Sequence, residues 1–151
     1  MQQKFRGAIV ALATATIVSV PVFAEPTAED ALDYRQAVMT ALRGHIGASS
    51  LIVRGLVEDD GNLVRHAEGL ANGAKELHRL FQAGSNVGES EALPAIWERP
   101  EEFAAAIGKA EEATAAFVDA AKGGDREVIG AAFRNVGMAC RGCHDNFRVA
   151  H

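Results

Sequence analysis

The chain has 151 residues, of which 48% are hydrophobic and 23% charged, and its formal net charge at pH 7 is −5. This length suits one compact domain with a single core, and the acidic balance argues against nucleic-acid binding. Two cysteines are too few to form a disulfide scaffold in a chain of this size.

Residues 1–24 are predicted to be a cleavable secretory signal peptide. A short positive start is followed by an apolar run over residues 8–20 and by small residues around a cleavage site after Ala24. An uncleaved membrane anchor is the alternative, which the short run and the good cleavage site disfavour. The mature domain is then residues 25–151, which we expect in the periplasm without stable membrane insertion.

The mature chain is predicted to be all-α, because no strand-like alternation lasts long enough to build a sheet. The first helix is expected from Thr27 to about Gly55, with Glu29 and Asp30 in its first turn, where negative charge suits the helix dipole. Residues spaced alternately four and three positions apart lie on one face of this helix, and that face is expected to pack in the core of a bundle. Its positions are Ala28, Leu32, Arg35, Met39, Leu42, Ile46, Ser49 and Val53.

The rest of the chain predicts three further long helices. They are expected at residues 62–81, at residues 100–124 and from Asp125 onward, with a single turn at residues 95–98. Pro100 suits a first helical turn, and Asp125 can cap the last helix. Residues 82–94 form a long loop of the kind that often carries a site. The other connections are short, which favours an antiparallel up-down-up-down four-helix bundle.

Both cysteines lie in the C-terminal sequence "CRGCHDNFR". Cys140 and Cys143 are three residues apart on the core face of the last helix, and His144 follows directly. The pattern C-x-x-C-H is typical of c-type haem attachment, in which two thiols bond the vinyl groups and the imidazole reaches the iron. We therefore predict one covalent haem c, with Cys140 and Cys143 as its thioether anchors.

Three other interpretations of the two cysteines are weaker. A disulfide between them would close a very short loop and stabilise little, and a redox dithiol belongs beside a βαβ pattern that is absent. A zinc site needs about four ligands. The other histidines show no paired spacing, and the first of them is expected to be solvent-exposed. They are His45, His66, His78 and His151.

Two residues of the first helix fit a haem inside the bundle. Arg35 lies on the buried face, where haem propionates would be a partner for its charge; the alternative is a side chain that reaches solvent. Met39 follows one turn later and is either core packing or a sulfur ligand of the iron. Met138 precedes His144 by six residues on the same helix, so it cannot readily reach the opposite haem face. Methionine opposite histidine raises the potential for electron transfer.

With these features the mature chain resembles class II c-type cytochromes, the family of cytochrome c′ and the low-spin cytochromes c-556. The similarity is carried by "YRQAVM", "LPAIW" and the C-terminal "CRGCHDNFR". The resemblance implies a four-helix bundle around one covalent haem, with His144 as the proximal iron ligand. It further implies haem contacts from Arg35, Gln36 and, in the long loop, Glu91, and it places Arg148 beside the imidazole.

The resemblance leaves two functions open at Met39. In cytochromes c-556 a methionine at this place binds the iron and gives a six-coordinate, low-spin electron carrier. In cytochromes c′ the iron stays five-coordinate and high-spin and binds nitric oxide or carbon monoxide. We expect the low-spin carrier, and a cavity between the first and last helices lined by Met39 and Cys143.

The remaining expectations concern activity and partners. No nucleophile and base pair or paired-carboxylate arrangement stands out, so we expect no enzymatic activity. The expected partners are redox proteins of the periplasm, and a diatomic gas if the iron is open. Homodimerisation through the apolar segment at residues 49–57 is a further possibility.

Overall fold

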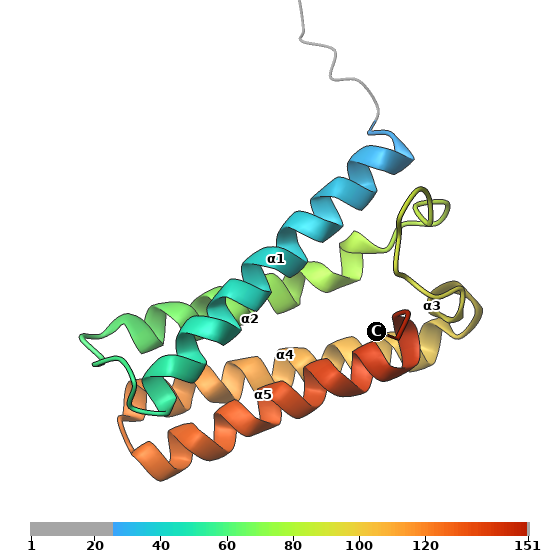
Figure 1. Ribbon diagram of the computed structural model, residues 1–151. Coiled ribbons are helices and arrows are strands. Elements are labelled where there is room, and N and C mark those ends of the chain that lie inside the picture. The colour runs from blue at the N-terminus through green and yellow to red at the C-terminus, as the bar shows by residue number, and fades with distance from the viewer. Residues whose placement is uncertain (1–25, 151) are drawn as a thin grey trace, which may run out of the picture.

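The computed structural model describes residues 26–150, which form an antiparallel four-helix bundle with one additional short helix (Figure 1). The elements are α1 (Ala28–Val53), α2 (Asn62–Leu80), α3 (Ala95–Glu98), α4 (Pro100–Gly123) and α5 (Arg126–Phe147). The predicted all-α fold is confirmed. The predicted signal peptide, residues 1–24, lies outside the described residues.

The starts of α1 and α5 are fixed by side-chain caps. The Thr27 hydroxyl accepts a hydrogen bond from the Asp30 backbone N–H at 3.1 Å, and the Asp30 carboxylate accepts one from the Thr27 N–H at 2.9 Å. This reciprocal pair is a capping box. Asp125 Oδ1 accepts from the backbone of Glu127 and Val128 at 2.9 and 3.1 Å. These local signals explain why the sequence predicts both helix starts correctly.

Two glycines of α2 allow α1 to pack closely against it. A Cβ atom at Gly69 would lie 2.4 Å from His45 Nε2, and one at Gly73 would lie 2.6 Å from Leu42 Cδ2. A larger residue at either position would have to displace the His45 ring or the Leu42 side chain. In Figure 1, α1 crosses α2 and diverges from α5 toward its N-terminus, whereas α4 and α5 run side by side.

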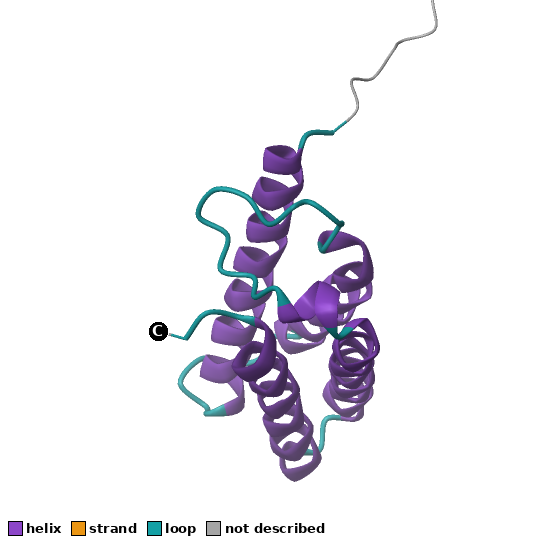
Figure 2. Ribbon diagram, turned by 90° about the vertical axis from the view of Figure 1, so that its right-hand side faces the viewer, coloured by secondary structure: helices purple, strands orange, loops and turns teal. Residues whose placement is uncertain are grey.

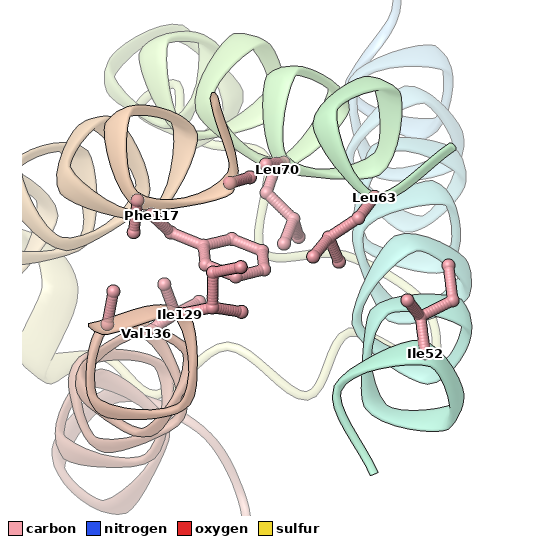
Figure 3. Close-up of a cluster of buried hydrophobic side chains, with 10 residues drawn as sticks. Ile52, Leu63, Leu70, Phe117, Ile129 and Val136 are labelled. Carbon is pink, nitrogen blue, oxygen red and sulfur yellow. The ribbon is translucent and has the colours of Figure 1, made fainter. Parts of the chain in front are cut away.

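The first hydrophobic cluster fills the end of the bundle where α1 ends and α5 begins. All four long helices contribute to it, and the Phe117 ring lies at its centre (Figure 3). Phe117 and Val136 are completely buried. The members of this first cluster are Ile52, Leu63, Ala67, Leu70, Phe117, Ala120, Ala121, Ile129, Ala132 and Val136.

The second hydrophobic cluster lies at the opposite end, beneath the long loop. The Phe103 ring packs edge-on against Phe81 and Phe147, with centroid separations of 4.9 and 5.1 Å. Partly buried side chains from α1 and α5, Met39 and Cys143 among them, pack against this cluster. Its buried members are Ala74, Leu77, Leu80, Ile96, Phe103, Ile107, Ala110 and Phe147.

The loop between α2 and α3 covers this end of the bundle (Figure 2). It pairs with the chain that leaves α5: the Leu93 N–H donates to the Phe147 carbonyl at 3.0 Å, and the Val149 N–H donates to the Glu91 carbonyl at 2.9 Å. Trp97 Nε1 donates to the Phe81 carbonyl at 3.2 Å. These bonds hold the loop next to the C-terminal turns of α5.

The surface of the described residues has one apolar strip near the end of α1. Leu51, Leu56 and Val57 are exposed there, whereas Ser49 and Ile52 from the same segment are buried. None of the helices within residues 26–150 is long and apolar enough to cross a membrane.

Replacing Ser49 by alanine is expected to raise the free energy of unfolding by about 1 kcal/mol, because the Ser49 hydroxyl is buried and has no hydrogen-bond partner among the described residues. Urea unfolding of the haem-loaded protein measures this. Ser50→Ala is the matched control, since it makes the same change one residue along α1 at a half-buried position. An equal gain in both variants would show that helix propensity, not the buried hydroxyl, is responsible.

Candidate haem site

The C-x-x-C-H sequence lies in the last turns of α5. Cys140 and Cys143 are free thiols, both partly buried. Cys140 packs against the first hydrophobic cluster and Cys143 against the second. The two sulfur atoms therefore belong to the core-facing side of α5, as the spacing predicts.

Burial keeps both thiols protonated. It raises the pKa of Cys140, and it raises the pKa of Cys143 to about 11, with a smaller contribution from the neighbouring Cys140. A buried neutral thiol is a poor metal ligand and a poor nucleophile at neutral pH. Within residues 26–150 no group of three or more His, Cys, Asp or Glu side chains could hold a metal ion.

His144 is partly buried beside charged neighbours. Burial is the main cause that lowers its pKa, and the charge of Arg148 adds to this. Asp145 and Glu91 act in the opposite direction. The imidazole is therefore neutral at pH 7, and the neutral ring is the form that coordinates iron. Arg148 and Glu91 thus lie near the imidazole, as the resemblance implies for Arg148.

Arg35 is buried, with only 4% of its surface exposed, so the alternative of a side chain that reaches solvent is wrong. Its guanidinium donates to the Leu80 carbonyl at 3.2 Å, to Ser85 Oγ at 2.9 Å and to Ser90 Oγ at 3.0 Å. It also lies over the Phe81 ring, 5.1 Å from the centroid. The sequence analysis did not identify these neutral partners, which are the two loop serines and the last residue of α2.

The other three residues predicted to contact the haem differ in how deeply they are buried. Met39 is half-buried and packs against the second cluster, which Cys143 also contacts. Gln36 is exposed on α1. Glu91 is exposed in the long loop, and its carbonyl oxygen holds the Val149 N–H. Met39 therefore shares the second cluster with Cys143, as do its α1 neighbours Val38 and Leu42, and of these three it alone carries a sulfur donor.

An open groove of about 690 Å³ borders Cys143, but it lies between α4 and α5. We expected a cavity between the first and last helices, and Met39 is not part of this lining. The groove exists because small side chains face each other there. They include Ala105, Ala106, Ala113 and Ala116 of α4 and Ala139 and Gly142 of α5.

A pair of histidines also differs from the sequence-based expectation. His45 is half-buried rather than exposed, and its Nδ1 lies 3.1 Å from Nδ1 of His66. The two residues are 21 positions apart and belong to different helices, so spacing along the chain does not reveal the pair.

The residues present fit a covalent haem. Two free thiols and a neutral imidazole lie together on α5, beside an apolar cluster. Arg35 supplies a buried cation at the same end of the bundle, where burial lowers its pKa and an anionic group would stabilise its charge.

Comparison with known proteins agrees with this donor set. The family model for cytochrome c′ matches residues 30–148. A cytochrome c′ from Pararhodospirillum photometricum is 32% identical over 118 residues, which is 78% of this chain and 94% of that protein. A cytochrome c-556 from Agrobacterium tumefaciens (strain B2A) is 31% identical over 119 residues, 78% of this chain and 96% of the relative. The nitric oxide complex of a cytochrome c prime variant from Alcaligenes xylosoxidans has a TM-score of 0.76 at 29% identity, and covers 82% of this chain and 97% of that structure.

Proposed function

Since this chain belongs to the cytochrome c′ family, we propose that it is a periplasmic electron carrier in which His144 and Met39 are the two axial ligands of the haem iron. Proteins of this family are haem proteins without enzymatic activity. They bind one covalent haem c through a C-terminal C-x-x-C-H, which is Cys140, Cys143 and the histidine after them in this chain.

The observation that carries the proposal is the position of Met39. Its side chain on α1 packs against the same apolar cluster as Cys143 on α5. A thioether is a soft ligand that binds ferrous iron well, and its pairing with histidine favours electron transfer. Met138 is the other methionine of the described chain, and it is 64% exposed on α5 itself. Met39 is thus the sulfur ligand that this fold best supports.

The haem, when bound, supplies an iron that cycles between the ferric and ferrous states. The protein supplies its surroundings: Met39 and the second cluster exclude water, and Arg35 offers a buried cation for the propionates. Gln36 and Glu91 are proposed as further contacts, with Glu91 acting from the loop that covers the end of α5.

A second candidate function is the binding of a diatomic gas. A structural relative, the cytochrome c prime variant from Alcaligenes xylosoxidans, forms a nitric oxide complex. In this alternative His144 alone would bind the iron, and Met39 would pack in the pocket where the gas binds. The two functions therefore differ in a single bond, the one between Met39 and the iron.

The proposed location and partners follow from the carrier function. Redox proteins of the periplasm are the proposed donors and acceptors, and a basic docking patch on them would complement the acidic balance of this chain. The exposed strip of Leu51, Leu56 and Val57 is a candidate contact for a second copy.

Visible absorption spectra of the purified haem-loaded protein test the proposal. We expect a sharp, split ferrous spectrum, a weak far-red sulfur-to-iron band in the ferric protein, and no change on addition of carbon monoxide. A broad high-spin ferrous band that shifts at once with carbon monoxide would contradict the carrier function and support gas binding.

A further inference from the structure

Two imidazole rings lie next to each other across the α1–α2 interface, on helices other than the one that carries the attachment cysteines. The Nδ1 atoms of His45 and His66 are 3.1 Å apart, their ring centroids are 5.4 Å apart, and both side chains are half-buried. We propose that His45 and His66 form a two-nitrogen binding site for a late first-row transition-metal dication, and that Cu²⁺ binds there most tightly.

The separation of the two nitrogens matches chelation of one ion. Imidazole nitrogens bind such metals at roughly 2.0–2.1 Å, so two of them at angles of about 90–110° on one ion are roughly 2.9–3.4 Å apart. The observed separation of 3.1 Å lies within that range. An ion can therefore bridge His45 and His66 once each ring turns so that its Nδ1 lone pair points at the ion instead of at the other ring.

The same separation also fits a hydrogen bond, but the two states need different tautomers. A hydrogen bond requires a proton on one Nδ1 and a lone pair on the other. Metal binding requires a lone pair on both, with the ring protons on the two Nε2 atoms. The ion thus takes the place of the shared proton, which moves to the Nε2 of its own ring.

The packing around His45 places its ring against α2. Gly69 of α2 lies directly against the ring, since a Cβ atom at that position would be 2.4 Å from Nε2 and 2.5 Å from Cε1. A glycine is needed there for the ring to lie flat against α2. The ring thus lies against α2 through its Nε2 side, and its Nδ1 faces His66.

Solvent-accessible space lies next to His66, one of the two proposed ligands. A cavity of about 170 Å³ borders this residue, and Glu58 and Asn62 are among its polar lining residues. Because residues 26–150 contain no cluster of three or more possible ligands, the protein supplies two donors and water completes the coordination. Imidazole donors favour copper, nickel and zinc over magnesium and calcium, and Cu²⁺ is the strongest binder in the divalent series.

Calorimetric titration of the oxidised, haem-loaded protein with CuCl₂, NiCl₂, ZnCl₂ and MgCl₂ tests the site. We expect one equivalent of Cu²⁺ to bind, with Ni²⁺ and Zn²⁺ weaker and Mg²⁺ without detectable binding. Electron paramagnetic resonance of the copper complex should show hyperfine coupling to two imidazole nitrogens. A spectrum with coupling to one nitrogen, or to none, would overturn the proposal without recourse to any variant.

Three variants assign the site to this pair. His45→Gln and His66→Gln should each lower Cu²⁺ affinity by about 10²-fold, because the loss of one donor removes the chelate advantage. Gly69→Ala should lower the affinity while keeping both histidines, since the methyl group displaces the His45 ring. His78→Gln is the matched control, because His78 is an exposed histidine of α2 whose Nε2 lies 3.6 Å from Glu111. Undiminished binding in both pair variants, or an equal loss in the control, would overturn the assignment.

Discussion

Replacing Met39 by leucine is expected to convert a six-coordinate, low-spin protein into a five-coordinate, high-spin one that binds carbon monoxide. Leucine has nearly the volume of methionine, so the second cluster keeps its packing at a cost below about 1.5 kcal/mol. It has no donor atom, so in the proposed carrier the iron would lose its sixth ligand. The ferric far-red band should disappear, and the ferrous spectrum should shift on addition of carbon monoxide, to which the proposed six-coordinate parent protein should be indifferent.

Met138→Leu provides the control for this change. It makes the same substitution at an exposed position of α5, where the side chain is 64% exposed. Its spectra should match those of the parent protein in both oxidation states. If Met39→Leu kept the far-red band and ignored carbon monoxide, Met39 would be a packing residue and the sixth ligand would have to come from elsewhere in the chain.

The helices were predictable because their signals are local. A four-three repeat of apolar positions fixes the face of each helix, and Thr27, Asp125 and Pro100 mark where helices begin. The helix ends were predicted less closely: α1 ends at Val53, two residues before the predicted end near Gly55, and α2 and α4 each end one residue before the predicted position. Gly55 instead adopts a left-handed conformation, with φ of 71°, just after the helix.

The attachment cysteines were predictable for a similar reason, since three residues within one helical turn define them. The surroundings of Arg35 were not, because its partners belong to a loop whose path depends on contacts with the end of α5. The position of a residue on the apolar face of a helix predicts that its side chain is buried, but it does not predict which residues the side chain contacts. The same holds for Met39: its spacing fixes its face, whereas ligation depends on a distance that no spacing encodes.

The His45–His66 pair is a second contact that the sequence alone does not reveal. Residues 21 positions apart on two helices meet only if the helices pack at one register. Gly69 and Gly73 set that register, because each accepts a side chain of α1 against the backbone of α2. The sequence contains both glycines, but a glycine in a helix pattern has several interpretations, and only the structure shows which side chain each one admits.

Replacing Arg35 by methionine is expected to lower the free energy of unfolding by about 3 kcal/mol. Methionine keeps the aliphatic length of the side chain and removes the charged donors that hold the Leu80 carbonyl, Ser85 and Ser90. Hydrogen bonds from charged groups contribute roughly 1.5–3 kcal/mol each, and part of this is regained when the loop oxygens meet water. Urea unfolding measures the loss, and hydrogen exchange should show faster opening of residues 81–94.

Arg43→Met separates the role of the buried guanidinium from a general effect of charge, because Arg43 is exposed on the same helix. That variant should unfold at the urea concentration of the parent protein. Arg35→Lys should recover only part of the loss, since one ammonium group cannot reach the set of oxygens that a planar guanidinium spans. Equal stability of Arg35→Met and the parent protein would mean that the loop is held by its backbone pairing with residues 147–149. In that case the charge of Arg35 would serve the haem propionates alone, and its removal would change the redox potential without changing stability.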